Sequence, residues 1–256
     1  RRQRQMCIRD SDMQSKILKF LREVMNYALE KDDISKNVAK AKFLTRVFKK
    51  SKPLIDPLMA DDAARFLQEI EKLPLGHVKL SLLLLLNTGM RPEEMLAIRA
   101  GSIIFDEREA TINITSVVSR DGKTVKDYPK SDASRRSVPV DAYTAEIAKQ
   151  WAGLKSEQMK ELGFKPSMSM LLCGPEMKPR TYQSFLRDWR SFIEQADFAG
   201  TRPYALRHTF ATLNLANGEN IKTVSVLMGH ASSAYTLDLY AGYVPNTGLG
   251  IGTRYM

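Results

Sequence analysis

The feature that most constrains the fold is Val78–Asn87, a segment that is apolar on nearly every side of a helix. It reads VKLSLLLLLN, and its longest apolar run is Leu82–Leu86. A helix without a polar face must be covered from all directions, so this one belongs at the centre of a hydrophobic core. The run is far shorter than the roughly 20 residues of a membrane-spanning helix. Gly89 is placed to end the helix.

Length and charge narrow the class of protein. A chain of 256 residues can bury one substantial core, and 43% of its residues are hydrophobic. Lysine and arginine exceed aspartate and glutamate by ten, which favours a polyanionic partner, most simply nucleic acid. A basic but unspecialised protein is the alternative interpretation.

Two absences in the sequence limit the compartment and the kinds of site. Cys7 and Cys173 are the only cysteines, so neither a disulfide framework nor a cysteine zinc site is expected. No apolar segment follows the basic start, so no signal peptide is predicted. We therefore expect a cytoplasmic protein without a membrane segment.

Hydrophobic periodicity predicts a mainly helical α+β protein. Residues 102–106, 110–115 and 135–140 alternate as strands, and Asp121–Gly122 is a hairpin turn signal, which together predict a small three-stranded antiparallel meander. The predicted helices are Asp61–Lys72, Val78–Asn87, Pro92–Arg99, Asp141–Leu162, Thr181–Ala196, Tyr204–Asn217, Ile221–Met228 and Tyr235–Tyr243.

We predict four parts along the chain. Residues 1–11 have no periodicity and are interpreted as a non-native or disordered leader, with a basic arm that touches DNA as the alternative. Residues 12–50 hold a helix, opened by a capping box from Ser11 to Gln14, and a polar, lysine-rich linker. Residues 51–245 form the main domain, and residues 246–256 are a glycine-rich, flexible tail.

Three segments carry the groups that phosphodiester chemistry needs: TGMRPEEM at 88–95, YALRH at 204–208 and MGHASSAYTLDLY at 228–240. Planar guanidinium groups bind phosphate oxygens bidentately. A tyrosine can act as a covalent nucleophile. Two arginines, a histidine and a late tyrosine therefore suggest cleavage of nucleic acid without a metal.

These segments, with KSDASRRSVPV at 130–140, resemble the tyrosine recombinases, or phage-integrase family, in order and spacing over about residues 11–245. The resemblance implies a DNA breaking–rejoining fold, with the helix at 12–31 similar to the end of the family's core-binding domain. It implies double-stranded DNA as partner, assembly into a tetramer on DNA, and no metal or other cofactor.

The resemblance assigns Arg91 and Arg207 as the two catalytic arginines. Taken alone, Arg91 could equally be a surface arginine at a helix start. Glu94 matches an acidic position that supports the active-site arginine. His208 follows Arg207 by one helical step, about 100°, so we assign it to packing or support.

The resemblance also assigns a lysine and a second histidine. Lys130 matches the general acid that protonates the leaving 5′ oxygen, although a lysine near a turn is usually only solvated. We expect the following pair, Arg135 and Arg136, to contact the DNA backbone or solvent. His230 matches the histidine that hydrogen-bonds the scissile phosphate, with a polar helix C-cap as the alternative.

Tyr240 is the expected nucleophile, because its spacing from Gly229–His230 favours it over Tyr235 and Tyr243. Tyr204 stands where the family usually has histidine. A phenol has a pKa near 10 and cannot exchange protons at neutral pH as imidazole does.

The sequence therefore predicts a site-specific DNA recombinase that forms a 3′-phosphotyrosyl intermediate and integrates or excises a mobile element. Two alternatives stay open. One is a catalytically weak or inactive DNA-binding protein derived from an integrase, and the other is a type IB topoisomerase-like enzyme.

Overall fold

The computed structural model describes residues 2–41, 44, 56–106, 110–119, 121–127, 134–174 and 178–243. The chain divides into two compact units, Arg1–Leu54 and Ile55–Met256. The predicted boundary at residue 50 and the predicted tail at 246–256 lie outside the described residues.

The first unit is built on one long helix, α1 (Arg2–Glu30), followed by the short 3-10 helix η1 (Val38–Lys40). The prediction that this helix begins at Ser11 was wrong. Arginine, glutamine and methionine favour helix, and no glycine or proline interrupts residues 2–10, so the helix continues through them. The Asn37 amide donates to the Arg22 carbonyl (3.1 Å) and thereby holds the following turn against α1.

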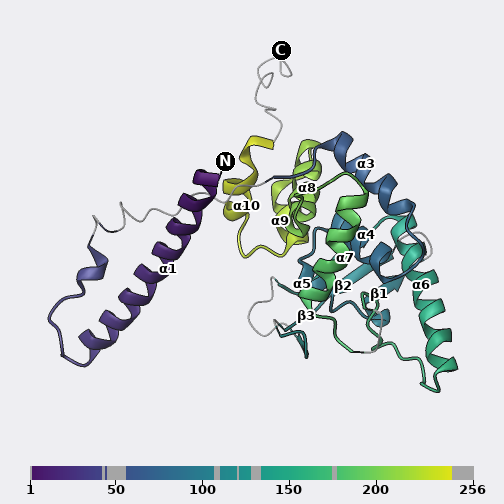
Figure 1. Cartoon of the computed structure of the whole chain (residues 1–256), viewed down its shortest axis with the longest axis horizontal. Coiled ribbons are helices and arrows are strands. Elements are labelled where there is room, and N and C mark those ends of the chain that lie inside the picture. The colour runs from purple at the N-terminus through teal and green to yellow at the C-terminus, as the bar shows by residue number, and fades with distance from the viewer. Residues whose placement is uncertain are drawn as a thin grey trace, which may run out of the picture. The chain divides into compact units, whose positions relative to one another are not determined.

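The second unit contains most of the helices (Figure 1). Their existence and order agree with the predictions, except that the helix opened by Pro92 is only one turn long. They are α3 (Ala60–Glu71), α4 (His77–Thr88), α5 (Pro92–Met95), α6 (Ala142–Glu161), α7 (Tyr182–Gln195), α8 (Pro203–Ala216), α9 (Ile221–Met228) and α10 (Ser233–Tyr240), with the short η2 (Ala100–Ser102) and η4 (Ala241–Tyr243).

Side-chain caps begin several of these helices. Asp141 accepts from the Thr144 amide (2.9 Å) at the start of α6, and Thr181 accepts from the Ser184 amide (3.0 Å) at the start of α7. Each cap pairs a backbone N–H that has no partner within the first helical turn, so the sequence fixes where the helix begins.

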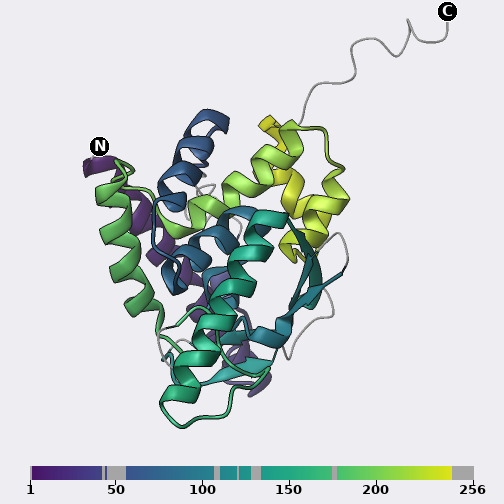
Figure 2. The ribbon, with the colours of Figure 1, turned by 90° about the vertical axis from the view of Figure 1, so that its right-hand side faces the viewer.

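Helix α4 lies at the centre of the core, as its apolar sequence predicts. Leu80 and Leu82–Leu85 are completely buried. Helices α3, α6 and α8 all contact α4, and Figure 2 shows the same unit from the side, with α6 in front of the core helices. Gly89 ends α4 in the left-handed conformation (φ 61°), which glycine adopts without steric cost.

The strands form one three-stranded sheet and one separate hairpin. Strands β1 (Ile103–Phe105), β2 (Ala110–Ile114) and β5 (Arg136–Val140) are antiparallel in the order β1-β2-β5. The predicted three-stranded sheet is therefore confirmed.

The Asp121–Gly122 turn has a different place from the one predicted. It joins two additional short strands, β3 (Ser116–Val118) and β4 (Val125–Asp127), rather than two strands of the main sheet.

No helix of the described residues combines the length and the apolar character that a bilayer crossing requires.

Candidate active site

The first part of the site is the junction between α4 and α5. Arg91 is the N-cap residue of α5, and Glu94 lies three residues on. One oxygen of Glu94 accepts from the Arg91 amide (2.7 Å), and the other accepts from the Arg91 guanidinium (2.8 Å). The carboxylate thus caps the helix and orients the arginine at the same time.

A second arginine reaches Glu94 from the sheet. Arg136, the first residue of β5, pairs with the same carboxylate at 2.7 Å, and both side chains are almost completely buried. The prediction that Arg136 contacts the DNA backbone or solvent was therefore wrong. Along β5, Arg136 shares the inward face with Val138 and Val140, whereas Ser137 and Pro139 face outward. Arg135 is exposed.

The C-terminus of α9 is where the arginines converge. Three successive carbonyl groups there each accept a hydrogen bond from a different arginine: Leu227 from Arg136 (2.5 Å), Met228 from Arg207 (2.6 Å) and Gly229 from Arg91 (3.3 Å). These carbonyls have no partner within the helix, and they carry the negative end of its dipole. The end of α9 therefore gathers positive charge from α5, α8 and β5.

Arg207 is the most deeply placed of these groups. Its guanidinium also donates to the Gly89 carbonyl (2.5 Å), so it joins the ends of α4 and α9. Burial, with Arg91 nearby, lowers the pKa of Arg207 to about 10, and the side chain stays charged at neutral pH. Arg91 and Arg136 share the Glu94 carboxylate, whereas Arg207 binds backbone carbonyls, and the excess positive charge of the three suits a phosphodiester.

His230 directly follows the left-handed Gly229 that ends α9. Its Nδ1 atom is hydrogen-bonded to the Thr236 hydroxyl (2.7 Å), and the Tyr235 ring packs edge-on against it at 5.0 Å. Burial, followed by the charge of Arg207, lowers the pKa of His230 to about 3. At neutral pH the ring is therefore neutral, and Nε2 is the nitrogen that can reach a ligand.

Tyr240 is the last residue of α10 and is completely buried. Its hydroxyl lies 2.6 Å from Nδ1 of His208. Burial raises the pKa of Tyr240, while Arg207 acts in the opposite direction. Figure 1 shows α8, α9 and α10 side by side, so Arg207 on α8 and Tyr240 on α10 lie on helices next to α9, the helix that His230 follows.

The sequence of the second unit matches a known protein family. Residues 57–244, which are more than half of the chain, match the Phage integrase family. This chain belongs to the phage integrase family. The whole site described above lies within the matched residues.

Curated relatives carry recombinase and integrase names. The chain is 24% identical over 244 residues to a protein named "Tyrosine recombinase XerC-like" from Caldanaerobacter subterraneus subsp. tengcongensis, which covers 88% of this chain and 61% of the relative. It is 28% identical over 160 residues to the "ICEBs1 integrase" of Bacillus subtilis, covering 62% of this chain and 43% of that protein. This integrase-family chain therefore spans about half the length of these relatives.

Solved structures show the same fold. The integrase of transposon Tn1549, solved in complex with a circular intermediate DNA, superposes with a TM-score of 0.74 at 20% identity, covering 94% of this chain and 78% of that one. The XerH site-specific recombinase bound to its difH substrate gives a TM-score of 0.56 at 21% identity, covering 73% and 50%. The predicted fold class is confirmed.

Tyr204, the residue at the position where the sequence analysis expected a histidine, lies in the first turn of α8. Its hydroxyl donates to Glu93 (3.1 Å), and the residue is 38% exposed. Burial, together with the Glu93 carboxylate, raises the pKa of Tyr204. The phenol therefore holds its proton more firmly than a free tyrosine, and its hydrogen-bond partner is Glu93.

Two further predictions concern Lys130 and a metal ion. Lys130 lies outside the described residues, as does the rest of segment 128–133. Among the described residues, no cluster of three or more histidine, cysteine, aspartate or glutamate side chains is arranged to hold a metal ion.

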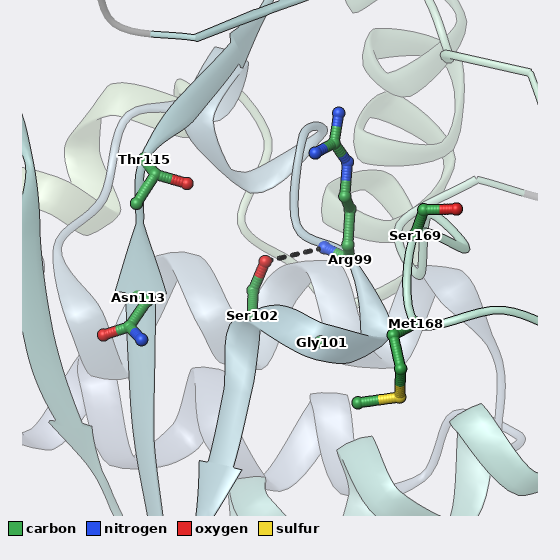
Figure 3. Close-up of a pocket in the computed structure, with 7 residues that line it drawn as sticks. All are labelled: Arg99, Gly101, Ser102, Asn113, Thr115, Met168 and Ser169. Carbon is green, nitrogen blue, oxygen red and sulfur yellow. Dashed lines mark hydrogen bonds between the residues drawn. The ribbon is translucent and has the colours of Figure 1, made fainter.

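A surface pocket of about 410 Å³ lies elsewhere in the integrase domain (Figure 3). It contains none of the arginine, histidine or tyrosine residues described above. In Figure 3 the Arg99 side chain extends away from Ser102, whose hydroxyl accepts from the Arg99 backbone amide. The residues that line the pocket are Arg99, Gly101, Ser102, Asn113, Thr115, Met168 and Ser169.

Two features of the site were not predicted from the sequence. The first is the inward position of Arg136. The alternation of RSVPV at 136–140 places Arg136 on the same face as Val138 and Val140, so the sequence did contain a signal for it. The contact between His208 and Tyr240 joins residues 32 positions apart, and no local pattern marks it.

Proposed function

We propose that this chain cleaves and rejoins DNA at specific sites through a 3′-phosphotyrosyl intermediate, with Tyr240 as the nucleophile. The observation that carries the proposal is the convergence of Arg91, Arg207 and His230 at the end of α9, beside the helix that carries Tyr240. Of the three candidate tyrosines, Tyr240 is the one with a hydroxyl hydrogen bond among the described residues, whereas Tyr235 is 52% exposed.

The chemistry follows from these positions. Arg91, Arg207 and His230 bind the non-bridging oxygens of the scissile phosphate and stabilise the charge that builds up in the transition state. Oη of Tyr240 attacks phosphorus and gives up its proton to a base, the bond between phosphorus and O5′ breaks, and O5′ takes a proton from Lys130. The phosphotyrosyl bond keeps the phosphate activated, so a 5′ hydroxyl from another strand can reverse the step and complete the exchange.

Charge and family membership support DNA as the substrate. The net charge of +10 favours a polyanion. The Tn1549 integrase and XerH were solved as complexes with DNA, and other relatives are named for mobile elements, such as the "Transposase from transposon Tn916" of Enterococcus faecalis. We therefore propose integration or excision of a mobile element, by four copies assembled on two duplexes.

Tyr240 must become accessible for this reaction. The residue is completely buried, so a phosphodiester cannot reach its hydroxyl in this conformation. Because α10 is only eight residues long and contacts α9 and the short η4, it is the element that has to shift. DNA binding would supply the free energy for that movement.

The test is covalent capture of DNA. The full chain is incubated with a library of nicked duplexes whose sequence is randomised around the nick, from which the cleaved end diffuses away. We expect SDS-resistant adducts on a DNA 3′ end, mapped by mass spectrometry to Tyr240. Repeated capture also yields the sequence that the wild-type protein prefers.

Matched variants decide among the alternatives. Tyr240→Phe should abolish the adduct and leave DNA affinity nearly unchanged, while Tyr235→Phe should still form it. Adducts that persist in Tyr240→Phe would show that another tyrosine is the nucleophile. DNA binding without any adduct would support the inactive DNA-binding protein, and relaxation of supercoiled plasmid without strand exchange would support the topoisomerase-like enzyme.

A further inference from the structure

The inference concerns the proton that the nucleophile must lose, and it rests on the function proposed above. The family's usual histidine is Tyr204 here, and a phenol hydrogen-bonded to Glu93 is no base. The chain has three histidines in all, at 77, 208 and 230. One of them contacts the Tyr240 hydroxyl, and it is the residue directly after the second arginine.

The geometry defines which partner holds the proton at rest. Nδ1 of His208 lies 2.6 Å from Oη of Tyr240, a short hydrogen bond. A buried hydroxyl that did not donate would leave its hydrogen unsatisfied, which typically costs about 1–3 kcal/mol. The Tyr240 hydroxyl therefore donates, Nδ1 accepts, and the ring hydrogen of His208 lies on Nε2.

The other two imidazoles are committed elsewhere. His77 lies at the start of α4, with its Nε2 3.4 Å from Asp188 on α7. His230 has its Nδ1 hydrogen-bonded to Thr236. Of the three histidines, His208 is the one for which the structure shows a hydrogen bond to the Tyr240 hydroxyl.

We propose that His208 keeps its hydrogen bond to Tyr240 as α10 shifts, and accepts the proton of Tyr240 as Oη attacks the scissile phosphorus. The Oη–P bond forms from an oxygen lone pair, and the O–H electrons stay on Oη as the proton moves to Nδ1. The P–O5′ bond breaks with its electron pair on O5′. In the rejoining step the imidazolium of His208 returns the proton to Oη.

The surrounding charge explains why the proton moves only on DNA. Burial, together with Arg207, lowers the pKa of His208 to about 4, so the free protein keeps its proton on Tyr240. A bound phosphodiester brings a negative charge that offsets Arg207 and raises the proton affinity of His208. The tyrosine oxygen also loses its own proton affinity as its bond to phosphorus forms.

The test uses single-turnover adduct formation on the duplex selected by the wild-type protein. His208→Asn keeps an amide near the position of Nδ1 but cannot accept the proton. General-base catalysis contributes on the order of 10²–10⁴-fold, so we expect a slowing in that range with DNA affinity unchanged. In wild-type protein the rate should fall on acidification, and His208→Asn should lose that dependence.

A more acidic nucleophile separates a base from a merely positioning group. Fluorinated tyrosine incorporated at position 240 is a stronger acid, so it should restore much of the rate lost in His208→Asn while changing the wild-type rate little. If His208→Asn lowers the melting temperature, His208→Gln replaces it in the same assays.

Each other result has a defined meaning. A wild-type protein that forms no adduct overturns the proposed function, and this inference with it. Wild-type adducts together with an equally fast His208→Asn overturn this inference alone. A faster His208→Asn, or no rescue by fluorinated tyrosine, shows that the hydrogen bond only restrains or positions Tyr240 and also overturns it.

Discussion

Arg136 and Glu94 form a buried ion pair, with Nη2 and Oε2 2.7 Å apart and side chains that are 2% and 0% exposed. The pair links β5 to α5. Since the same carboxylate holds Arg91 at 2.8 Å, the position of a catalytic arginine candidate depends on a residue of the sheet. Arg136 therefore acts on the site through Glu94 rather than through DNA.

Arg136→Ala should destabilise the protein strongly. The substitution leaves the Glu94 carboxylate buried with one arginine fewer, and breaking a buried pair costs about 3–5 kcal/mol. Urea denaturation measures the change. Arg135→Ala is the matched control, because its exposed side chain should alter stability by less than about 0.5 kcal/mol. Equal losses in the two variants would contradict the structural role of Arg136.

Arg135→Ala should instead weaken DNA binding. An exposed arginine that neutralises one phosphate contributes about 0.9 to the slope of log affinity against log salt concentration. We expect that slope to become shallower by about this amount, measured by fluorescence anisotropy over a salt series with the captured duplex. An unchanged slope would remove Arg135 from the DNA-contacting surface.

Gly89→Ala should disturb both the fold and the position of Arg207. A Cβ atom at Gly89 would lie 2.4 Å from Cδ1 of Phe210, in a backbone conformation with φ +61°. The left-handed conformation costs about 1–2 kcal/mol for an L-residue, and overpacking adds about 1–3 kcal/mol. The Gly89 carbonyl, which accepts from Arg207, would shift as well.

Gly218→Ala provides the comparison for Gly89→Ala. Gly218 also has a left-handed φ (+88°), but a Cβ atom there would meet nothing within 4 Å. Gly218→Ala should therefore lose only the free energy that the left-handed conformation costs, and should form the adduct as fast as wild type. Thermal denaturation and covalent capture, run on both variants, would expose the difference. A similar loss in both would mean that Phe210 moves aside at no cost.

The protein should lose stability on mild acidification through two partly buried histidines, His208 and His230. Burial lowers the pKa of His208 to about 4 and of His230 to about 3, from an ordinary value of 6.5. The unfolded chain binds protons below pH 6.5 that the folded chain does not, so the stabilisation present above 6.5 is lost progressively as the pH falls toward 4 and then 3. Urea midpoints across this range should depend less on pH in the double variant His208→Asn, His230→Asn.

Tyr204→His should keep or raise the rate of adduct formation. The imidazole would take the place next to Glu93 that the phenol now occupies, and it restores the family's usual group. Tyr204→Phe removes one partly exposed hydrogen bond and should slow the reaction by less than about tenfold, because such a bond contributes roughly 0.5–1.5 kcal/mol. An inactive Tyr204→His beside a fully active Tyr204→Phe would contradict this view of position 204.

The sequence predicted the helices and strands well where their formation depends on residues close together in the chain. The apolar segment at Val78–Asn87 became the buried α4, and Gly89 ended it. The start of α1 was missed because residues 2–10 have helix-forming side chains without apolar periodicity. The Asp121–Gly122 hairpin turn was predicted, but its own strands β3 and β4 were missed because strands of three residues are too short to show alternation.

The sequence by itself determined the set of candidate groups, since spacing and family resemblance single out Arg91, Arg207, His230 and Tyr240. Only the tertiary structure decided what each group contacts. Arg136 turned inward to Glu94, three arginines met at the end of α9, and His208 reached Tyr240 across 32 residues. Helical and strand periods are set by neighbours along the chain, whereas these contacts depend on how separate elements pack, which no local pattern encodes.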